Sequence, residues 1–266
     1  MKPLAILCHS ALFPNTDDAW KNEIPAHLKR RDPRIWQMAY VCAARLLKNS
    51  LVKPRSIIVG TALGALDETK GFLDGVFTDG FGSPKNFIAS VHNSMAGKLA
   101  LEFSIDGPNL TLCDGQNSFA SAIGNCDLLG QECFPALVVA VDENIPLLDA
   151  IVPALSSQCN RFLSGHKQEG AVSMLLDCSQ NTPRIRSVGP RYAGPMKDKA
   201  CTPAAIQALF GSSQPPARFY GLSECNSFLF AAIRTFTELQ KKQSGSTIIP
   251  SYSPSSNAFA AIELSL

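Results

Sequence analysis

The sequence has 266 residues, of which 45% are hydrophobic and 17% charged, and its formal net charge is +2. This length can bury a substantial core, and the small charge gives no basis for nucleic-acid binding. No apolar stretch approaches the roughly 20 residues that span a bilayer, so we expect a soluble protein without a membrane partner. The nine cysteines form no C-x-x-C pair, which predicts reduced thiols, a cytoplasmic location and no metal site.

The N-terminal part alternates short apolar runs with amphipathic segments. The run Leu4–Cys8 is shorter than the core of a signal peptide and predicts a first strand instead. Residues Arg34–Lys48 predict a helix, whose apolar face comprises Ile35, Met38, Ala39, Cys42 and Leu46. Between them lies a basic cluster, Lys29, Arg30, Arg31 and Arg34, interrupted by Asp32. It is typical of a solvated rim, and a docking site for an acidic carrier protein is the alternative.

The next segment predicts a strand at Ser56–Val59 and then a loop over Gly71–Gly82. We expect three aromatic side chains of this loop to cover apolar surface, namely Phe72, Phe77 and Phe81. Ser83 and Pro84 are typical of an N-cap and a first helical residue, and the helix should end near Phe103. Its expected buried stripe comprises Phe87, Val91, Met95 and Leu99, and Ala96-Gly97 should allow close approach of another backbone.

The remaining elements continue the alternation, in shortened form beyond Pro183. The expected strands are Ala136–Val141, Ala171–Leu176, Arg184–Val188, Ala217–Leu222, Thr247–Ile249 and Ala258–Leu264. The expected helices are Asn117–Leu129, Pro203–Phe210 and Cys225–Lys241. Strands alternating with amphipathic helices predict a layered α/β fold with a mostly parallel sheet.

Residues 107–116 carry the strongest functional signal. They read Gly-Pro-Asn-Leu-Thr-Leu-Cys-Asp-Gly-Gln and predict a turn, a short strand and a sharp corner into a helix. The N-terminus of a helix favours developing negative charge, and enzymes place an activated Ser or Cys at such corners. Gln116 occupies the corner here, and an amide cannot act as a nucleophile.

The motifs together resemble those of the β-ketoacyl synthases, the condensing enzymes of fatty-acid and polyketide synthesis. The matching residues are Pro84, Phe87, Ser90-Val91-His92-Asn93, Ala96-Gly97, Gly107-Pro108-Asn109, Val138–Asp142-Glu143 and Glu169-Gly170-Ala171. The resemblance implies a thiolase-like layered α/β/α/β/α fold. It also implies one ketosynthase-like domain over residues 1–266, with a complete N-terminal half at 1–180 and an abbreviated C-terminal half at 181–266.

The chain departs from the family where catalysis occurs. The family's nucleophilic Cys falls at Gln116, and Cys113 lies three residues too early, so we expect it in the core. The family's two catalytic histidines lie in its C-terminal half, whereas the four histidines here are His9, His27, His92 and His166. Condensation needs a thiolate and electrostatic help at the carbonyl. We therefore expect no catalytic residue, no cofactor and no self-sufficient ketosynthase.

Within the family, Gln at this position marks the chain length factor, the inactive partner of a catalytic ketosynthase. The short chain also resembles the small ketosynthase-like subunits of aryl polyene and related fatty-acid clusters. The resemblance implies a heterodimer with a β-ketoacyl synthase and transient contact with an acyl carrier protein. Its interface would include Asn109, Leu110, Thr111, Leu112 and Cys113. The tunnel would be lined by Phe119, Met95 and His92.

Two other functions are compatible with the same residues. Gln116 could donate a hydrogen bond to a malonyl thioester carbonyl, which would make the chain a malonyl-carrier decarboxylase that primes synthesis. Alternatively, the chain could be a scaffold that binds acyl carrier protein and has no tunnel role. No motif assigns a role to the segment Ile151–His166.

Overall fold

The computed structural model describes residues 2–14, 18–29, 32–155, 163–192, 202–211 and 215–266, so Arg30 and Arg31 of the basic cluster lie outside the described residues. Nine strands form one sheet in the order β3-β2-β4-β5-β1-β6-β9-β8-β7. Their bounds are β1 Leu4–Leu12, β2 Ser56–Gly60, β3 Asn109–Leu112, β4 Ala136–Asp142, β5 Gly170–Asp177, β6 Arg184–Tyr192, β7 Arg218–Phe219, β8 Ser246–Ser253 and β9 Ala258–Ser265.

The sheet consists of two halves that repeat one topology. They are joined through β1 and β6 by two residue pairs, Leu4 with Ile185 and Ala5 with Arg184. In the first half, β2 and β4 are parallel, and β5 is antiparallel to both β4 and β1. In the second half, β7 and β8 are parallel, and β9 is antiparallel to both β8 and β6. The described residues supply no second-half counterpart of β3.

The prediction of a mostly parallel sheet is wrong. Parallel pairing is confined to β2 with β3, β2 with β4, and β7 with β8, and the other pairs are antiparallel. The prediction of parallel strands was based on the unbroken apolar runs in the sequence. Such runs arise because helices cover both faces of a strand, and β4 is buried along its whole length. In this protein, helices cover both faces of the central strands whether neighbouring strands run parallel or antiparallel.

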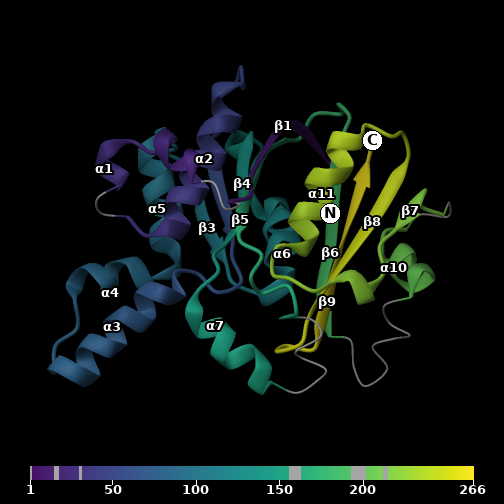
Figure 1. Ribbon diagram of the computed structural model, residues 1–266. Coiled ribbons are helices and arrows are strands. Elements are labelled where there is room, and N and C mark those ends of the chain that lie inside the picture. Colours follow the sequence, from purple (N-terminus) through teal and green to yellow (C-terminus); the bar gives the residue numbers. More distant parts are fainter. Residues whose placement is uncertain (1, 15–17, 30–31, 156–162, 193–201, 212–214) are drawn as a thin grey trace.

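Helices cover the sheet in layers (Figure 1). Helices α2 (Arg34–Lys48) and α5 (His92–Phe103) pack on the outer face of the first half, in an outer cluster that includes Ile57 and Val59 of β2. The intervening Ile58 points to the other face and belongs to an inner cluster between the two halves. This alternation places one strand in two cores, so the fold has the layered α/β arrangement that the sequence predicts.

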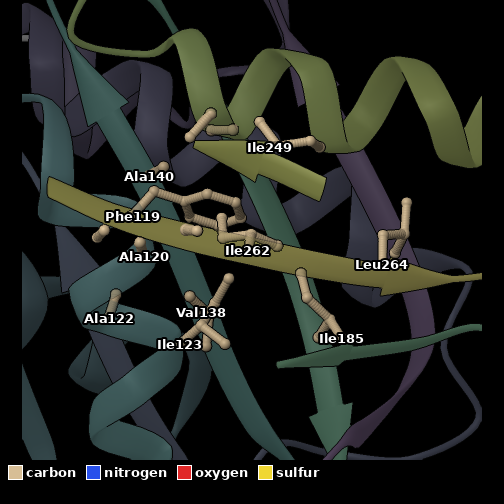
Figure 2. Packing of buried hydrophobic residues seen from close by; sticks show 14 of the residues in the cluster. Phe119, Ala120, Ala122, Ile123, Val138, Ala140, Ile185, Ile249, Ile262 and Leu264 are labelled. Atoms are coloured by element: carbon tan, nitrogen blue, oxygen red, sulfur yellow. The ribbon is translucent and has the colours of Figure 1, made fainter. Parts of the chain in front are cut away.

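The inner cluster is built on α6 (Ser118–Asn125) and α11 (Phe230–Lys241). Phe119 and Ile123 of α6 lie against Ile185 and Ile262 of the second half (Figure 2). On the opposite face of β6, the guanidinium carbon of Arg186 lies 5.1 Å from the ring centroid of Phe210. Phe210 directly follows α10 (Pro203–Leu209), and Phe210 and the buried Ile206 of α10 belong to the same apolar cluster as Ile185 and Ile262.

The remaining helical segments are shorter or lie at the periphery. The α-helices are α1 Ala26–Lys29, α3 Leu66–Asp79, α4 Pro84–Ser90 and α7 Pro146–Ile151. The 3-10 segments are η1 Ala19–Glu23, η2 Gly115–Asn117, η3 Cys126–Leu128, η4 Gln131–Cys133, η5 Val152–Ala154 and η6 Leu222–Glu224. In the described part of the chain, no helix combines the length and apolar character needed to cross a membrane.

The predicted loop over Gly71–Gly82 is instead largely helix α3. Asp67 and Glu68 lie in its first turn, where carboxylates interact favourably with the helix dipole. It ends at Gly80, whose φ of 68° is left-handed. Phe77 and Phe81 are 82% and 69% exposed, so they do not cover apolar surface of this chain.

The predicted helix from Pro84 to Phe103 is divided at Val91. This residue has extended backbone angles, φ −73° and ψ 122°, and it separates α4 from α5. The expected stripe is therefore broken, with Met95 and Leu99 buried and Phe87 and Val91 exposed. A Cβ added at Gly97 would meet only the side chain of Asn109 within 4 Å, so the expected close backbone approach is also absent.

Gly107 and Gly97 provide a matched pair for a stability test. A Cβ at Gly107 would lie 1.9 Å from the carbonyl oxygen of Arg55, so Gly107→Ala should lower the free energy of unfolding by about 2 kcal/mol or more. Gly97→Ala should be neutral or gain up to about 1 kcal/mol, because alanine favours the helix. Urea unfolding measures both, and equal midpoints for the two variants would contradict this packing.

Candidate functional site

The edge strand β3 leads into the candidate site. It is the terminal strand of the sheet and pairs with β2, from Ile57 with Asn109 to Gly60 with Leu112. The carbonyl oxygen of Pro108 accepts a hydrogen bond from the N–H of Ile57 in β2, and that of Leu112 accepts one from the N–H of Thr61, directly after β2. Successive residues of a strand direct their N–H and C=O groups to opposite sides of the strand. Thr111, between Leu110 and Leu112, therefore presents its N–H and C=O to the open edge.

The predicted interface residues all lie on this strand or at its end. Asn109 and Cys113 are exposed, and the three residues between them are half-buried. The hydroxyl oxygen of Thr111 is buried without a hydrogen-bond partner. The structure therefore places these residues at an open edge, and their contact with another subunit stays a prediction.

The corner after β3 is held by Ser118. Its Oγ accepts a hydrogen bond from the Asp114 N–H at 2.9 Å and lies 2.9 and 2.7 Å from the carbonyl oxygens of Thr61 and Gly115. Gly115 has a left-handed φ of 52°, which glycine adopts without strain. These contacts fix the turn from the strand into η2 and α6.

Gln116 lies inside this corner and is 2% exposed. Its neighbour Asn117 is fully buried, donates from Nδ2 to the carbonyl of Ala258 at 3.0 Å, and accepts at Oδ1 from Ser251 Oγ at 2.8 Å. A Cβ added at Gly115 would lie 2.7 Å from Ser253 Oγ. The corner therefore packs against β8 and β9 of the second half. The Gln116 side chain is enclosed by residues of its own chain.

The prediction that Cys113 packs in the core is wrong, because this residue is exposed at the end of β3. Its Sγ donates to the carbonyl of Ala62 at 3.1 Å. Desolvation raises the pKa of the Cys113 thiol, and the charges of Asp142 and Asp114 raise it further. The thiolate is the reactive form of cysteine, so this environment works against a nucleophilic role.

The histidines make contacts elsewhere. His9 lies 5.6 Å from the ring of Phe236, and burial together with Lys242 lowers its pKa. His27 contacts Glu102 at 3.0 Å. The buried His166 has Nδ1 2.9 Å from the carbonyl of Leu163 and Nε2 2.9 Å from Asp149 Oδ1. These contacts are those of structural histidines.

The structure does not bring together the three residues predicted to line a tunnel. Phe119 lies in the inner cluster and Met95 in the outer cluster, on opposite faces of the first half-sheet. His92 is exposed at the start of α5, with its ring against Gly64. Their tunnel role stays a prediction.

Two buried acids at the end of β4 had no role assigned from the sequence. Asp142 is 2% exposed and accepts hydrogen bonds from Thr61 Oγ1 and the N–H groups of Ala62 and Leu63 at 2.9 to 3.1 Å. Burial raises its pKa to about 7, although these donors act in the opposite direction. Two acids directly after an unbroken apolar strand are the sequence signal that marks this position.

The second acid, Glu143, is 8% exposed. Burial raises its pKa to about 8, and the carboxylates of Asp67 and Glu169 act in the same direction. Glu169 also pairs with Arg34 and accepts a hydrogen bond from the Asn144 N–H at 3.3 Å. The described residues contain no group of three His, Cys, Asp or Glu side chains that could hold a metal ion.

Two clefts lie beside the segment before β5. Their volumes are about 400 and 480 Å³, and both are lined by Gln168 and Ile233. The first also involves Asn226 and Arg234, and the second involves Glu169.

The repeated strand order and the corner after the edge strand define a thiolase-like ketosynthase fold. The family described as beta-ketoacyl synthase, N-terminal domain, matches residues 8–184. The chain therefore belongs to the β-ketoacyl synthase family, which confirms the family predicted from the sequence. No curated protein matches the chain.

Several solved structures share the fold over the whole chain. The ishigamide ketosynthase/chain length factor is 14% identical with a TM-score of 0.69, and 100% of this chain and 99% of that chain are covered. The ketosynthase ApeO in complex with its chain length factor ApeC from Xenorhabdus doucetiae is 15% identical with a TM-score of 0.66, and both chains are covered completely. The complex AntDE:AntF, a type II PKS acyl-carrier protein with its ketosynthase, is 14% identical with a TM-score of 0.75, covering 100% and 99%.

The buried Glu143 predicts a decline of stability with rising pH. Its pKa of about 8 in the folded protein exceeds the value of about 4.3 for an unperturbed glutamate, so the unfolded chain releases this proton first. The stability that this group contributes is complete below about pH 4 and is lost as the pH rises through 8. The slope approaches about 1.4 kcal/mol per pH unit at most.

Glu143→Gln should make the free energy of unfolding, measured with urea between pH 6 and 9, fall less steeply with pH. The part of the pH dependence that comes from Asp142 should remain. The exposed Glu132 offers a matched control, since Glu132→Gln should follow the wild-type profile. Parallel profiles for Glu143→Gln and the wild type would contradict the assignment.

Proposed function

We propose that this chain is a non-catalytic ketosynthase-like subunit of the chain length factor type. It pairs with an active β-ketoacyl synthase in the cytoplasm and shapes the acyl tunnel of that partner. The synthesis it serves is of the type II polyketide, aryl polyene or fatty-acid-like class, with acyl carrier protein as a transient partner. The observation that carries the proposal is the enclosed Gln116 at the family's nucleophile position.

The chemistry of the corner supports a structural role for Gln116. A carboxamide both donates and accepts hydrogen bonds, so it fills a buried helix start without needing an acyl group. Its 2% exposure leaves little access for a malonyl thioester. The raised pKa of Cys113 and the absence of histidine from residues 167–266 of the sequence remove the other groups that condensation requires.

The open edge of β3 supports pairing with another subunit. An exposed strand edge offers unpaired N–H and C=O groups to a strand of another chain. The solved structures that share this fold include a ketosynthase in complex with its chain length factor. Pairing of β3 across a two-fold axis would bring the two corners close to each other.

Thr111 tests this pairing, because its N–H faces the open edge. Thr111→Pro removes that donor and should weaken binding to the co-expressed ketosynthase about tenfold or more, because a strand pairing is broken. Thr111→Val keeps the N–H and removes a hydroxyl that has no partner, so it should bind like the wild type. Affinity purification and size-exclusion chromatography measure the complex. If the wild-type chains elute separately and the ketosynthase elongates normally alone, the proposed function is wrong.

Gln116→Ala separates the structural role from decarboxylation. Removal of a buried amide should lower the free energy of unfolding by about 1–3 kcal/mol and leave the product length of the complex unchanged. The isolated wild-type chain should form no acetyl-carrier protein from malonyl-carrier protein. Its formation by the isolated chain, and its loss in Gln116→Ala, would establish the decarboxylase instead.

A further inference from the structure

A further cavity, of about 330 Å³, lies at the C-terminal end of α11, near the end of the chain (Figure 1). We call it the α11 pocket, and its lining residues are His9, Thr182, Pro183, Leu239, Lys242, Ser244 and Leu266. The pocket and the Gln116 corner lie at opposite ends of the β8–β9 hairpin. The corner contacts Ser253 and Ala258, whereas the pocket lies beside the end where Ser246 pairs with Ser265. The strand β8 rises about 24 Å between these ends.

The floor of the α11 pocket is apolar and held in place by the fold. Leu239 is buried in the inner cluster, and Leu266 packs against the same cluster. The Leu266 N–H donates to the Gly245 carbonyl at 3.0 Å, and the Gly245 N–H donates to the Leu266 carbonyl at 3.4 Å. The carbonyl of Pro183 accepts a hydrogen bond from the Ile6 N–H at 2.8 Å. The apolar surface therefore exists before any ligand binds, as is typical of small-molecule sites.

The rim of the pocket carries an uncompensated positive charge. Lys242 is the C-cap of α11, is exposed, and has no ion-pair or hydrogen-bond partner among the described residues. The neighbouring Lys241, by contrast, donates to Glu238 Oε1 at 2.7 Å. The negative end of a helix dipole amounts to about half a charge, so the full charge of Lys242 exceeds that of the helix end. An anion at this rim would supply the partner that Lys242 lacks.

His9 is the second basic group of the pocket. Its ring lies 5.6 Å from that of Phe236, its Nε2 lies 3.2 Å from Gln240 Nε2, and Met174 of β5 is its cross-strand partner. Among these neighbours and Lys242, only Lys242 is charged, and burial together with that charge lowers the pKa of His9. A carboxylate beside both groups would favour the imidazolium. Anion binding and protonation of His9 should therefore reinforce each other.

The volume and the chemistry of the pocket limit what can enter it. A volume of about 330 Å³ is near the lower end of the range of about 300–1,000 Å³ for ligand pockets. At roughly 30 Å³ for a water-sized group, it holds about ten non-hydrogen atoms. The apolar floor favours an aliphatic chain, and the basic rim favours one anionic head group. An inorganic anion would leave the floor unused, and a neutral lipid would leave Lys242 without a partner.

We propose that the α11 pocket binds a medium-chain aliphatic carboxylate, with its chain on Pro183, Leu239 and Leu266 and its head group at Lys242 and His9. The pocket uses none of the residues that carry the proposed function, so this inference goes beyond that function and does not depend on it. A ligand of this size should bind with a dissociation constant on the order of 1 mM.

The test titrates octanoate into the full chain and follows the His9 imidazole by NMR. We expect a saturable shift, and a higher pKa of His9 when octanoate is bound. Lys242→Gln should raise the dissociation constant about threefold or more, as for loss of an exposed ion pair. Ser244→Trp fills the pocket from an exposed position and should raise it about tenfold or more. Lys241→Gln is the matched control, since Lys241 is paired with Glu238, and it should bind like the wild type.

Acetate and inorganic phosphate carry the charge without the chain, so both should bind at least about tenfold more weakly than octanoate. Equal affinity for either of them overturns the assignment of an aliphatic ligand. The absence of a saturable change at His9 overturns the site, as does octanoate binding that Lys242→Gln and Ser244→Trp leave unchanged. Pairing with a ketosynthase is tested separately by Thr111→Pro, so failure of one proposal leaves the other standing.

Discussion

Thr61 is the residue on which the geometry of the site depends. It directly follows β2 and is fully buried. Its N–H donates to the carbonyl of Leu112 at 3.0 Å, its Oγ1 donates to Asp142 at 2.9 Å, and its carbonyl lies 2.9 Å from Ser118 Oγ. Gly64 N–H donates to the same hydroxyl at 2.9 Å. One buried residue thus connects the edge strand, the corner, the end of β4 and the loop that precedes α3.

A second link joins the two halves of the molecule. The strands β1 and β6 meet through two residue pairs, so side chains must supply much of the connection. Phe119 and Ile123 provide apolar contact (Figure 2), and Asn117 provides a buried amide with both of its polar atoms bonded to the second half. Because a buried amide is costly to leave unpaired, this link specifies one arrangement of the halves as well as stabilising it.

Local patterns predicted the elements that have a buried face. Helix α2 has the predicted bounds, Arg34–Lys48, because its apolar stripe is complete and its five stripe residues are all buried. Helix α3 was missed because it has glycines at 71 and 75 and no buried stripe. The division at Val91 was missed because an i, i+4 pattern does not distinguish one helix from two that meet at an extended residue.

In the candidate site, too, local sequence patterns predicted some features, and others depend on residues far apart in the sequence. The position of Gln116 at the corner followed from the motif, because strand, turn and helix are adjacent in the sequence. Its enclosure by β8 and β9 could not be predicted, because the bonds of Asn117 reach residues 134 and 141 positions away. The exposure of Cys113 also depends on tertiary structure, since an apolar strand at a sheet edge looks the same in sequence as one inside the sheet.

The two ends of the nine-stranded sheet are unequal, and this limits how copies can assemble. At the end opposite β3, the terminal strand β7 has two residues, and its Arg218 is engaged with Glu238. So short a strand is a poor template for another chain. A protein with one usable sheet edge closes into a pair and does not propagate into a filament. Strand addition to this sheet would therefore recruit one subunit, at β3, and then stop.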